Sequence, residues 1–161
     1  MARPLRKPSG VRRALLRAPI WLYRARLGFL LDHRFLYLAH RGRRSGRRRE
    51  VVLEVVEYDP AASVVYVVSG WGPTSDWFRN LQAGPALEVR FGTRRYPAPE
   101  TQILTTPETL ALLERYRAGH PRTWRQLAKI MGLAPDASGT EVERGAERLP
   151  AVRFTLVRPS H

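Results

Sequence analysis

Apolar residues recur with two different periods along the chain, and the period changes near residue 33. Before that point, five apolar residues from Leu16 to Leu30 lie on one face of a helix that begins near Val11 and ends near Asp32. Beyond it, runs of alternating, β-branched or aromatic residues are bounded by Gly, Pro, Asp or Ser, as is typical of strands. About six strands are predicted: Phe35–His40, Arg49–Tyr58, Val64–Ser69, Leu87–Phe91, Arg95–Leu104 and Ala151–Val157.

The connections between these strands predict an antiparallel sheet. Asp59–Ser63 and Gly92-Thr93 are turn sequences, and short turns join antiparallel neighbours. We therefore expect an α+β fold, mainly β, in which about six antiparallel strands curl into a barrel with peripheral helices. Helices are predicted at Ser75–Gly84, residues 106–118 and Pro121–Met131, and residues 134–145 are interpreted as a loop or a weak helix.

Residues 1–32 are predicted to form a basic N-terminal arm and an amphipathic helix, and residues 33–161 to form one domain. The uncharged runs of this helix are far shorter than the ~20 apolar residues that cross a bilayer, so a membrane span is not expected. Two interpretations of residues 11–32 stay open, namely packing on the domain and peripheral contact with an anionic membrane. The expected location is the cytoplasm, with membrane association as the alternative.

Charge is distributed unevenly along the chain. The net charge is +14, and residues 1–50 carry 15 Lys and Arg against two acidic residues, a balance of +13 that leaves +1 for residues 51–161. The basic residues are 26 Arg and 2 Lys, a bias that genomic nucleotide composition also produces. The high isoelectric point alone therefore does not predict a nucleic-acid partner, and none is expected.

Several classes of chemistry are excluded or unsupported by the sequence. The chain has no Cys, which excludes disulfides, thiolate metal sites and cysteine nucleophiles. Its four histidines lack the spacing of metal ligands, so no metal site is expected. Neither Ser45 nor Ser69 lies in a nucleophile elbow, and no catalytic residue is assigned. An enzyme with this sequence needs a cofactor to supply the chemistry.

The segment Arg41–Arg49 places six arginines, two glycines and a serine between two predicted strands. Exposed backbone N–H groups around Ser45 and the planar guanidinium groups are both suited to hold a phosphate. The alternative is an ordinary polar hairpin connection with solvated charges.

A second segment, Ser69-Gly-Trp-Gly72, lies where a predicted strand ends and a helix is about to begin. A loop of this kind presents backbone N–H groups together with a flat aromatic face, and so suits a planar ring. The alternative is a turn whose glycines serve the backbone and whose tryptophans are core residues.

The order of these motifs resembles the deazaflavin-dependent nitroreductase family. The resemblance rests on Gly-Arg-Arg-Ser-Gly-x-x-Arg after a strand, Ser-Gly-Trp-Gly after a later strand, and Asp-Trp-Phe-Arg-Asn-Leu before Gly-Pro. It covers residues 35–104 and extends through the last strand. It implies a split β-barrel of the flavin-binding superfamily that binds coenzyme F420, whose side chain carries a phosphodiester and an oligoglutamate tail.

The resemblance also implies the roles of particular residues. Arg41, Arg47 and Arg48 remain as solvated charges. The small-molecule substrate is expected to be hydrophobic. Carried over by position, Arg43, Arg44, Ser45 and Arg49 hold the phosphate, Ser69, Gly70, Trp71 and Gly72 line the deazaflavin ring, Trp77 closes the pocket with Asn80 at its edge, and Tyr116, His120 and Trp124 border the substrate pocket.

The function predicted on this basis is transfer of a hydride from reduced F420 to an electron-poor hydrophobic acceptor such as an enone, a quinone or a nitro compound. Two alternatives stay open. The same arginines suit the phosphate of FMN, and the basic N-terminal half suits a non-catalytic module that binds polyanions or membranes. The chain is expected to be a monomer or a homodimer.

Overall fold

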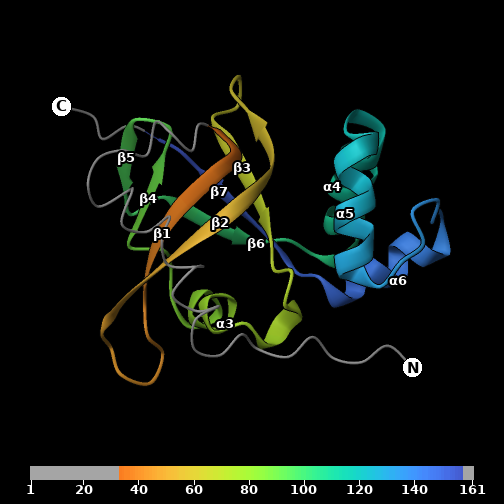
Figure 1. The fold of residues 1–161 in the computed structure, drawn as a ribbon. Helices are drawn as coiled ribbons and strands as arrows, with labels where there is room; N and C mark the ends of the chain where they lie inside the picture. The colour runs from red at the N-terminus through yellow and green to blue at the C-terminus, as the bar shows by residue number, and fades with distance from the viewer. Residues whose placement is uncertain (1–32, 158–161) are drawn as a thin grey trace, which may run out of the picture.

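The structure is a computed structural model that describes residues 33–157. Seven strands form one sheet in the order β5-β4-β1-β2-β3-β7-β6, and each neighbouring pair is antiparallel (Figure 1). The predicted arm and helix of residues 1–32 lie outside the described residues. The strands are β1 (Phe35–Arg41), β2 (Arg48–Asp59), β3 (Val64–Val68), β4 (Glu88–Phe91), β5 (Arg94–Pro97), β6 (Glu100–Ile103) and β7 (Ala151–Thr155).

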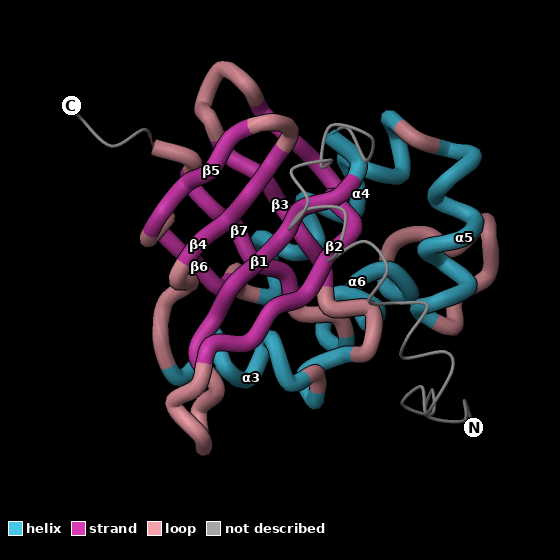
Figure 2. Tube along the Cα trace, turned by 60° about the vertical axis from the view of Figure 1, so that its left-hand side comes forward, coloured by secondary structure: helices cyan, strands magenta, loops and turns pink. Residues whose placement is uncertain are grey.

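The sheet curls into a barrel because its two edge strands are joined by a very short link. β5 pairs with β4 at one edge and β6 pairs with β7 at the other, yet only Ala98 and Pro99 separate them. A link of this length spans about 11 Å at most, so the two edges of the sheet must come together. Figure 2 shows the strands wrapping around a common interior. The prediction of a mainly β, antiparallel barrel is confirmed.

The prediction of one strand over Arg95–Leu104 is wrong, because this segment forms two strands. Ala98 has φ 45°, in the left-handed region, and its N–H donates to the carbonyl of Leu87 at 2.9 Å. Pro99 has no N–H to donate to a ladder. The break lets the chain leave one edge of the sheet and start the other.

The alternation of side chains along β1 separates the barrel interior from its outer face. Leu36 and Leu38 are fully buried in the main core. Tyr37 and Ala39 point to the opposite face, where Val52 packs against them. Successive side chains of a strand point to opposite faces, and in β1 both faces are covered, so both sets of side chains are buried.

The predicted turn at Asp59–Ser63 is confirmed, because the Asp59 carboxylate accepts hydrogen bonds from the N–H groups of Ala61 and Ala62 at 2.9 and 3.1 Å. Such bonds from an aspartate to the backbone ahead of it stabilise a turn. Gly92, with φ 57°, likewise lies between β4 and β5 as predicted.

The helices divide between one end and one side of the barrel. α3 closes the end at which the β1–β2 hairpin projects, while α4, α5 and α6 lie together at the side (Figure 1). A second core that includes Leu113, Trp124 and Val142 joins these three helices. No helix within residues 33–157 is long and apolar enough to cross a membrane. The helices are the 3-10 turn η2 (Gly72–Thr74), α3 (Asp76–Ala83), α4 (Thr106–Gly119), α5 (Pro121–Met131) and α6 (Thr140–Arg148).

Local sequence explains where α4 begins. Thr105 accepts a hydrogen bond from the Glu108 N–H at 3.4 Å, and the Glu108 carboxylate accepts one from the Thr105 N–H at 2.7 Å, which is a capping box. Residues 134–145, interpreted as a loop or a weak helix, contain a loop followed by the first part of α6.

Glu88 is a buried carboxylate on β4 that binds three arginines. Arg95 Nη2 and Arg48 Nη2 lie 2.6 and 3.3 Å from its Oε2, and Arg90 bonds its Oε1. Burial alone raises the pKa of Glu88, but hydrogen bonds from Arg90 and Arg95 outweigh it and hold the pKa below its usual 4.5. Arg48 was predicted to be a solvated charge, and instead belongs to this ion-pair network.

Replacing Glu88 with Gln preserves the side-chain volume but removes the charge on which three guanidinium groups converge. We expect the free energy of unfolding at pH 7 to fall by about 3 kcal/mol, the usual cost of breaking a buried ion pair. Because folding lowers the pKa of Glu88, its stabilisation is present above pH 4.5 and is lost as the pH falls through the lowered value. Urea denaturation at decreasing pH should show the two proteins converging in stability, and equal stability at pH 7 would contradict the expectation.

Candidate functional site

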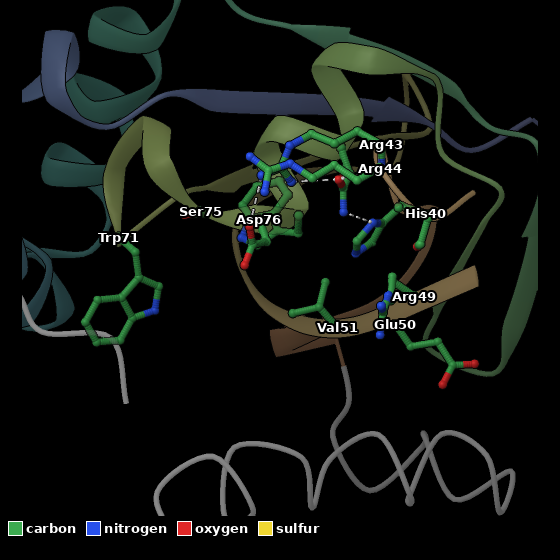
Figure 3. A pocket seen from close by; sticks show the side chains of 13 residues that line it. His40, Arg43, Arg44, Arg49, Glu50, Val51, Trp71, Ser75 and Asp76 are labelled. Carbon is green, nitrogen blue, oxygen red and sulfur yellow. Dashed lines mark hydrogen bonds and ion pairs between the residues drawn. The ribbon is translucent and has the colours of Figure 1, made fainter. Parts of the chain in front are cut away.

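A cavity of about 580 Å³ lies between the β1–β2 hairpin and α3. Figure 3 shows its two sides, with Trp71 on one and His40, Arg49 and Glu50 on the other. Three arginines and two carboxylates line it, so its wall carries an excess of positive charge. The lining residues are His40, Gly42, Arg43, Arg44, Ser45, Arg49, Glu50, Val51, Trp71, Ser75, Asp76, Trp77 and Asn80.

Backbone hydrogen bonds hold the connection between β1 and β2 in shape. The Gly42 N–H donates to the Arg47 carbonyl, and the Gly46 N–H donates to the Gly42 carbonyl, each at 2.8 Å. Gly46 has φ 65°, which glycine adopts without strain. Ser45 Oγ accepts a hydrogen bond from the Arg47 N–H at 3.3 Å. The arginines of the connection therefore project from a defined backbone.

Asn80, a buried residue of α3, fixes Arg43 at the cavity wall. Its Oδ1 accepts hydrogen bonds from the Arg43 backbone N–H at 3.0 Å and from Arg43 Nη1 at 2.9 Å. Arg43 Nη2 forms an ion pair with Asp76 Oδ1 at 3.2 Å. The Arg43 guanidinium is thus held in place by the folded protein.

Arg44 and Arg49 differ from Arg43 because their guanidinium groups form no ion pair with another described residue. Both side chains are exposed and line the cavity. Guanidinium groups in this state can bind an incoming anion without first breaking an internal bond.

His40 lies at the end of β1 and is only 4 % exposed. Its Nδ1 is 3.0 Å from Asn80 Nδ2. Burial, together with the positive charge of Arg49 and against the opposing effect of Asp76, lowers the pKa of His40 from its usual 6.5 to about 4. The ring is therefore neutral at physiological pH.

A second cavity of about 450 Å³ shares Trp71 and Trp77 with the first. Valines of β2 and β3 and residues of α4 and α5 form its remaining walls, so it is mainly apolar. Trp71 lies between the two cavities with 46 % of its surface exposed. The lining residues are Val52, Leu53, Glu54, Val55, Val56, Val68, Gly70, Trp71, Trp77, Tyr116, Thr123, Gln126 and Leu127.

The Ser69–Gly72 loop is held by its own hydrogen bonds. Ser69 Oγ donates to the Gly72 carbonyl at 2.7 Å and also bonds Ser75 Oγ. Gly72 has φ 73°, and a Cβ built on it would lie 3.2 Å from the Arg148 carbonyl oxygen, so both its backbone and its surroundings favour glycine. Ser69 is buried and shapes this loop, while Gly70 and Trp71 line the second cavity.

The structure brings most of the residues singled out in the sequence to these two cavities. Arg43, Arg44, Ser45, Arg49 and Asn80 line the first, Gly70 and Tyr116 line the second, and Trp71 and Trp77 line both.

Two of the residues expected at the substrate pocket line neither cavity. Trp124 is 2 % exposed in the second core, where its Nε1 donates to the Pro135 carbonyl at 3.2 Å. His120 is exposed at the end of α4, with its ring centroid 5.1 Å from that of Tyr116.

Sequence reasoning missed His40, Asp76 and the cavity-lining face of α5. The histidines were searched for metal spacing alone, and no group of three His, Cys, Asp or Glu within residues 33–157 is arranged to hold a metal ion. A signal for His40 was present, because it immediately precedes the arginine-rich connection and ends an apolar strand. The α5 residues Thr123 and Gln126 gave no such signal, since only tertiary packing places them beside β2.

Comparison with solved structures shows the same fold. An F420-H2 dependent reductase, FDR-A, superposes with a TM-score of 0.51 and 18% sequence identity, over 76% of this chain and 95% of that one. A protein described as a domain-swapped dimer gives a TM-score of 0.50 and 18% identity, over 85% of this chain and 99% of that one.

No curated protein sequence matches this chain. The model of one family, however, matches residues 16–128, and its description is F420H(2)-dependent quinone reductase. The matched range includes the arginine-rich connection, the Ser69–Gly72 loop and α3. The chain therefore belongs to the F420H(2)-dependent quinone reductase family and is a split-barrel oxidoreductase whose cofactor is coenzyme F420.

Proposed function

We propose that the cationic cavity binds the phosphate of F420, that the deazaflavin ring lies beside the Ser69–Gly72 loop, and that a hydrophobic acceptor occupies the apolar cavity. One observation carries this proposal: a cavity with three arginines and a cavity walled by valines share Trp71 and Trp77. A ligand with an anionic tail and a planar ring fits such a pair, because each end of the ligand meets a matching surface.

The donors of the first cavity fit a phosphate group. Arg43 is held ready by Asn80 and Asp76, and the uncommitted charges of Arg44 and Arg49 supply the remaining donors. Charge-assisted hydrogen bonds from guanidinium to phosphate are among the stronger polar contacts in proteins. Ser45 lines the same cavity and adds a hydroxyl group.

The ring is best placed beside Trp71. This side chain is 46 % exposed although it borders both cavities, which leaves an aromatic face free to stack on a planar ligand. The Ser69 hydroxyl already bonds the Gly72 carbonyl, so the loop offers Gly70 and Trp71 to the ring, and Ser69 acts by holding the loop.

The walls of the second cavity favour an apolar acceptor with few polar groups. Val52, Val55 and Leu127 supply apolar surface, and Thr123 and Gln126 are the neutral polar side chains beside Tyr116. Electron-poor acceptors such as quinones, enones or nitro compounds combine an apolar body with one or two oxygen acceptors, which the Gln126 amide can orient. The Thr123 hydroxyl already donates to the His120 carbonyl at 3.3 Å.

Reduced F420, when bound, supplies the hydride. The protein's own contribution is to hold the two partners face to face at ~3–3.5 Å and to keep water from the reacting atoms. The arginines fix the cofactor at one end, and the apolar walls hold the acceptor at the other. The proton that completes the reduction comes from water or from a nearby side chain, and no residue becomes covalently attached.

Other predictions from the sequence stand as proposals. The protein acts in the cytoplasm as a monomer or a homodimer, without a nucleic-acid partner. Peripheral membrane contact would depend on residues 11–32, which lie outside the described residues.

Removing one uncommitted guanidinium should weaken the binding of F420. For Arg44→Ala and Arg49→Ala we expect the Kd to rise about tenfold each, since a hydrogen bond to a charged group is worth ~1.5–3 kcal/mol. Fluorescence titration of the purified protein with F420 measures the change, and a parallel titration with FMN should give weaker binding.

Arg47→Ala is the matched control for this experiment. Arg47 lies on the same connection and carries the same charge, but it does not line the cavity. The Kd of Arg47→Ala for F420 should stay within about threefold of the Kd of the unaltered protein, because only a screened, long-range charge is lost. Equal weakening by all three variants would show a diffuse field instead of a phosphate site, and tighter binding of FMN would favour the flavin alternative.

Filling the apolar cavity should impair the acceptor and spare the cofactor. For Gln126→Trp we expect the KM for a small quinone such as menadione to rise at least about fivefold, while the Kd for F420 stays within about twofold, because one added indole occupies acceptor space. Steady-state kinetics with saturating reduced F420 measures the first quantity and fluorescence titration the second.

Arg125→Trp is the control, since Arg125 is the neighbouring exposed residue of α5 and does not line the cavity. It should leave both constants unchanged. If Gln126→Trp weakened the binding of F420 and left the KM for the quinone unaltered, the second cavity would hold part of the cofactor. The acceptor would then have to bind elsewhere.

A further inference from the structure

His40 is a buried histidine on the wall of the cationic cavity, and the proposed phosphate site gives it no role. It is 4 % exposed and pairs with Arg49 across the β1–β2 ladder. In Figure 3 the His40 ring lies between Arg49 on one side and Arg43 and Arg44 on the other. A buried polar side chain that lines a cavity requires an account of both its ring nitrogens.

The hydrogen bonds of Asn80 determine whether His40 Nδ1 is a donor or an acceptor. Asn80 Oδ1 faces the backbone N–H and the Nη1 group of Arg43, and both of these can only donate. The other end of the amide, Nδ2, must then be a donor, and it faces His40 Nδ1 at 3.0 Å. His40 Nδ1 is therefore the acceptor of this bond, and the neutral ring carries its hydrogen on Nε2.

The second ring nitrogen, Nε2, is not hydrogen-bonded by the described part of the protein. Within residues 33–157, His40 Nε2 has no hydrogen-bond partner, and the residue lines the cavity. Burial, and after it the neighbouring charge of Arg49, disfavour a second proton on the ring. His40 thus presents one neutral donor, with a fixed direction, in a cavity whose other donors are charged.

We propose that His40 Nε2–H donates a hydrogen bond to a phosphate oxygen of the bound cofactor and so selects its position among the arginines. This inference rests on the phosphate site proposed above. Guanidinium groups on long side chains attract an anion from many directions, whereas a buried imidazole held by Asn80 accepts one geometry. His40 is accordingly a positioning residue for the cofactor, and Asn80 orients it while also fixing Arg43.

Two substitutions of His40 separate its two hydrogen bonds. In His40→Asn, the amide oxygen falls near the place of Nδ1 and can still accept from Asn80, but the donor toward the cavity is lost. In His40→Gln, the amide nitrogen reaches toward the place of Nε2 and can still donate to the ligand, while the bond from Asn80 is weakened. A merely structural histidine would make these variants differ in stability alone.

The test measures two quantities, the Kd for F420 and the unfolding temperature, for the unaltered full-length protein and for both variants. We expect His40→Asn to keep its unfolding temperature and to bind F420 about tenfold more weakly, and His40→Gln to lose unfolding temperature and to stay within about threefold in Kd. For a deazaflavin that lacks the phosphate and the tail, His40→Asn should bind as the unaltered protein does, within about twofold.

Four results would overturn the proposal. Unchanged F420 binding by His40→Asn would show that Nε2 contacts no ligand. Equal weakening for the phosphate-free deazaflavin would place the contact away from the phosphate. Absence of F420 binding by the unaltered protein would remove the phosphate site itself, and is distinguished from a failure of His40 because it appears before any substitution. A ¹⁵N spectrum of the histidine ring that shows hydrogen on Nδ1 would contradict the assigned tautomer directly.

Discussion

The two-residue link between β5 and β6 is the constraint on which the arrangement of the whole site depends. Because Ala98 and Pro99 join strands at opposite edges of the sheet, the sheet has to close on itself. Closure places the β1–β2 connection, the end of β3 and the start of α3 around one opening. Residues separated by about forty positions, such as His40 and Asn80, then share one hydrogen-bond chain.

The second level of organisation is the arrangement of a basic loop around the cavity that we propose as the anion site. Six arginines in one connection repel one another, and the protein manages this by giving them different partners. Arg43 is bound by Asn80 and Asp76, Arg48 turns to Glu88, and Arg44 and Arg49 stay uncommitted at the cavity. Positive charge is thereby retained at the cavity and compensated elsewhere. The pairing also explains why composition alone cannot locate the site.

Much of the fold follows from local patterns in the sequence. The alternation along β1 and β2, the turn at Asp59 and the glycine after β4 are all short-range signals, and they give strands close to those observed. The break at Ala98 was missed although Pro97 and Pro99 flank it, and proline is itself a local signal against a continuous strand. Strand order, by contrast, is a long-range property that the alternation of apolar and polar residues does not encode.

The site divides in the same way. Residues that lie next to each other in a motif, such as Arg43, Arg44 and Ser45, reach one cavity because one turn carries them. Residues that depend on the packing of distant helices do not follow the motif, so Trp124 enters a core while Gln126, two positions along the same helix, faces the apolar cavity.

The two cavities place opposite demands on the protein, and the fold meets them with different elements. The anionic end needs fixed donors, which a hydrogen-bonded turn, a ladder and a buried amide supply. The apolar end needs a surface that excludes water, which valines of two strands and one face of α5 supply. If the cofactor's phosphate binds in the cationic cavity as we propose, α5 can change in sequence without altering the phosphate contacts, since no residue of α5 lines that cavity. On the same proposal, one barrel can keep its cofactor and vary its acceptor.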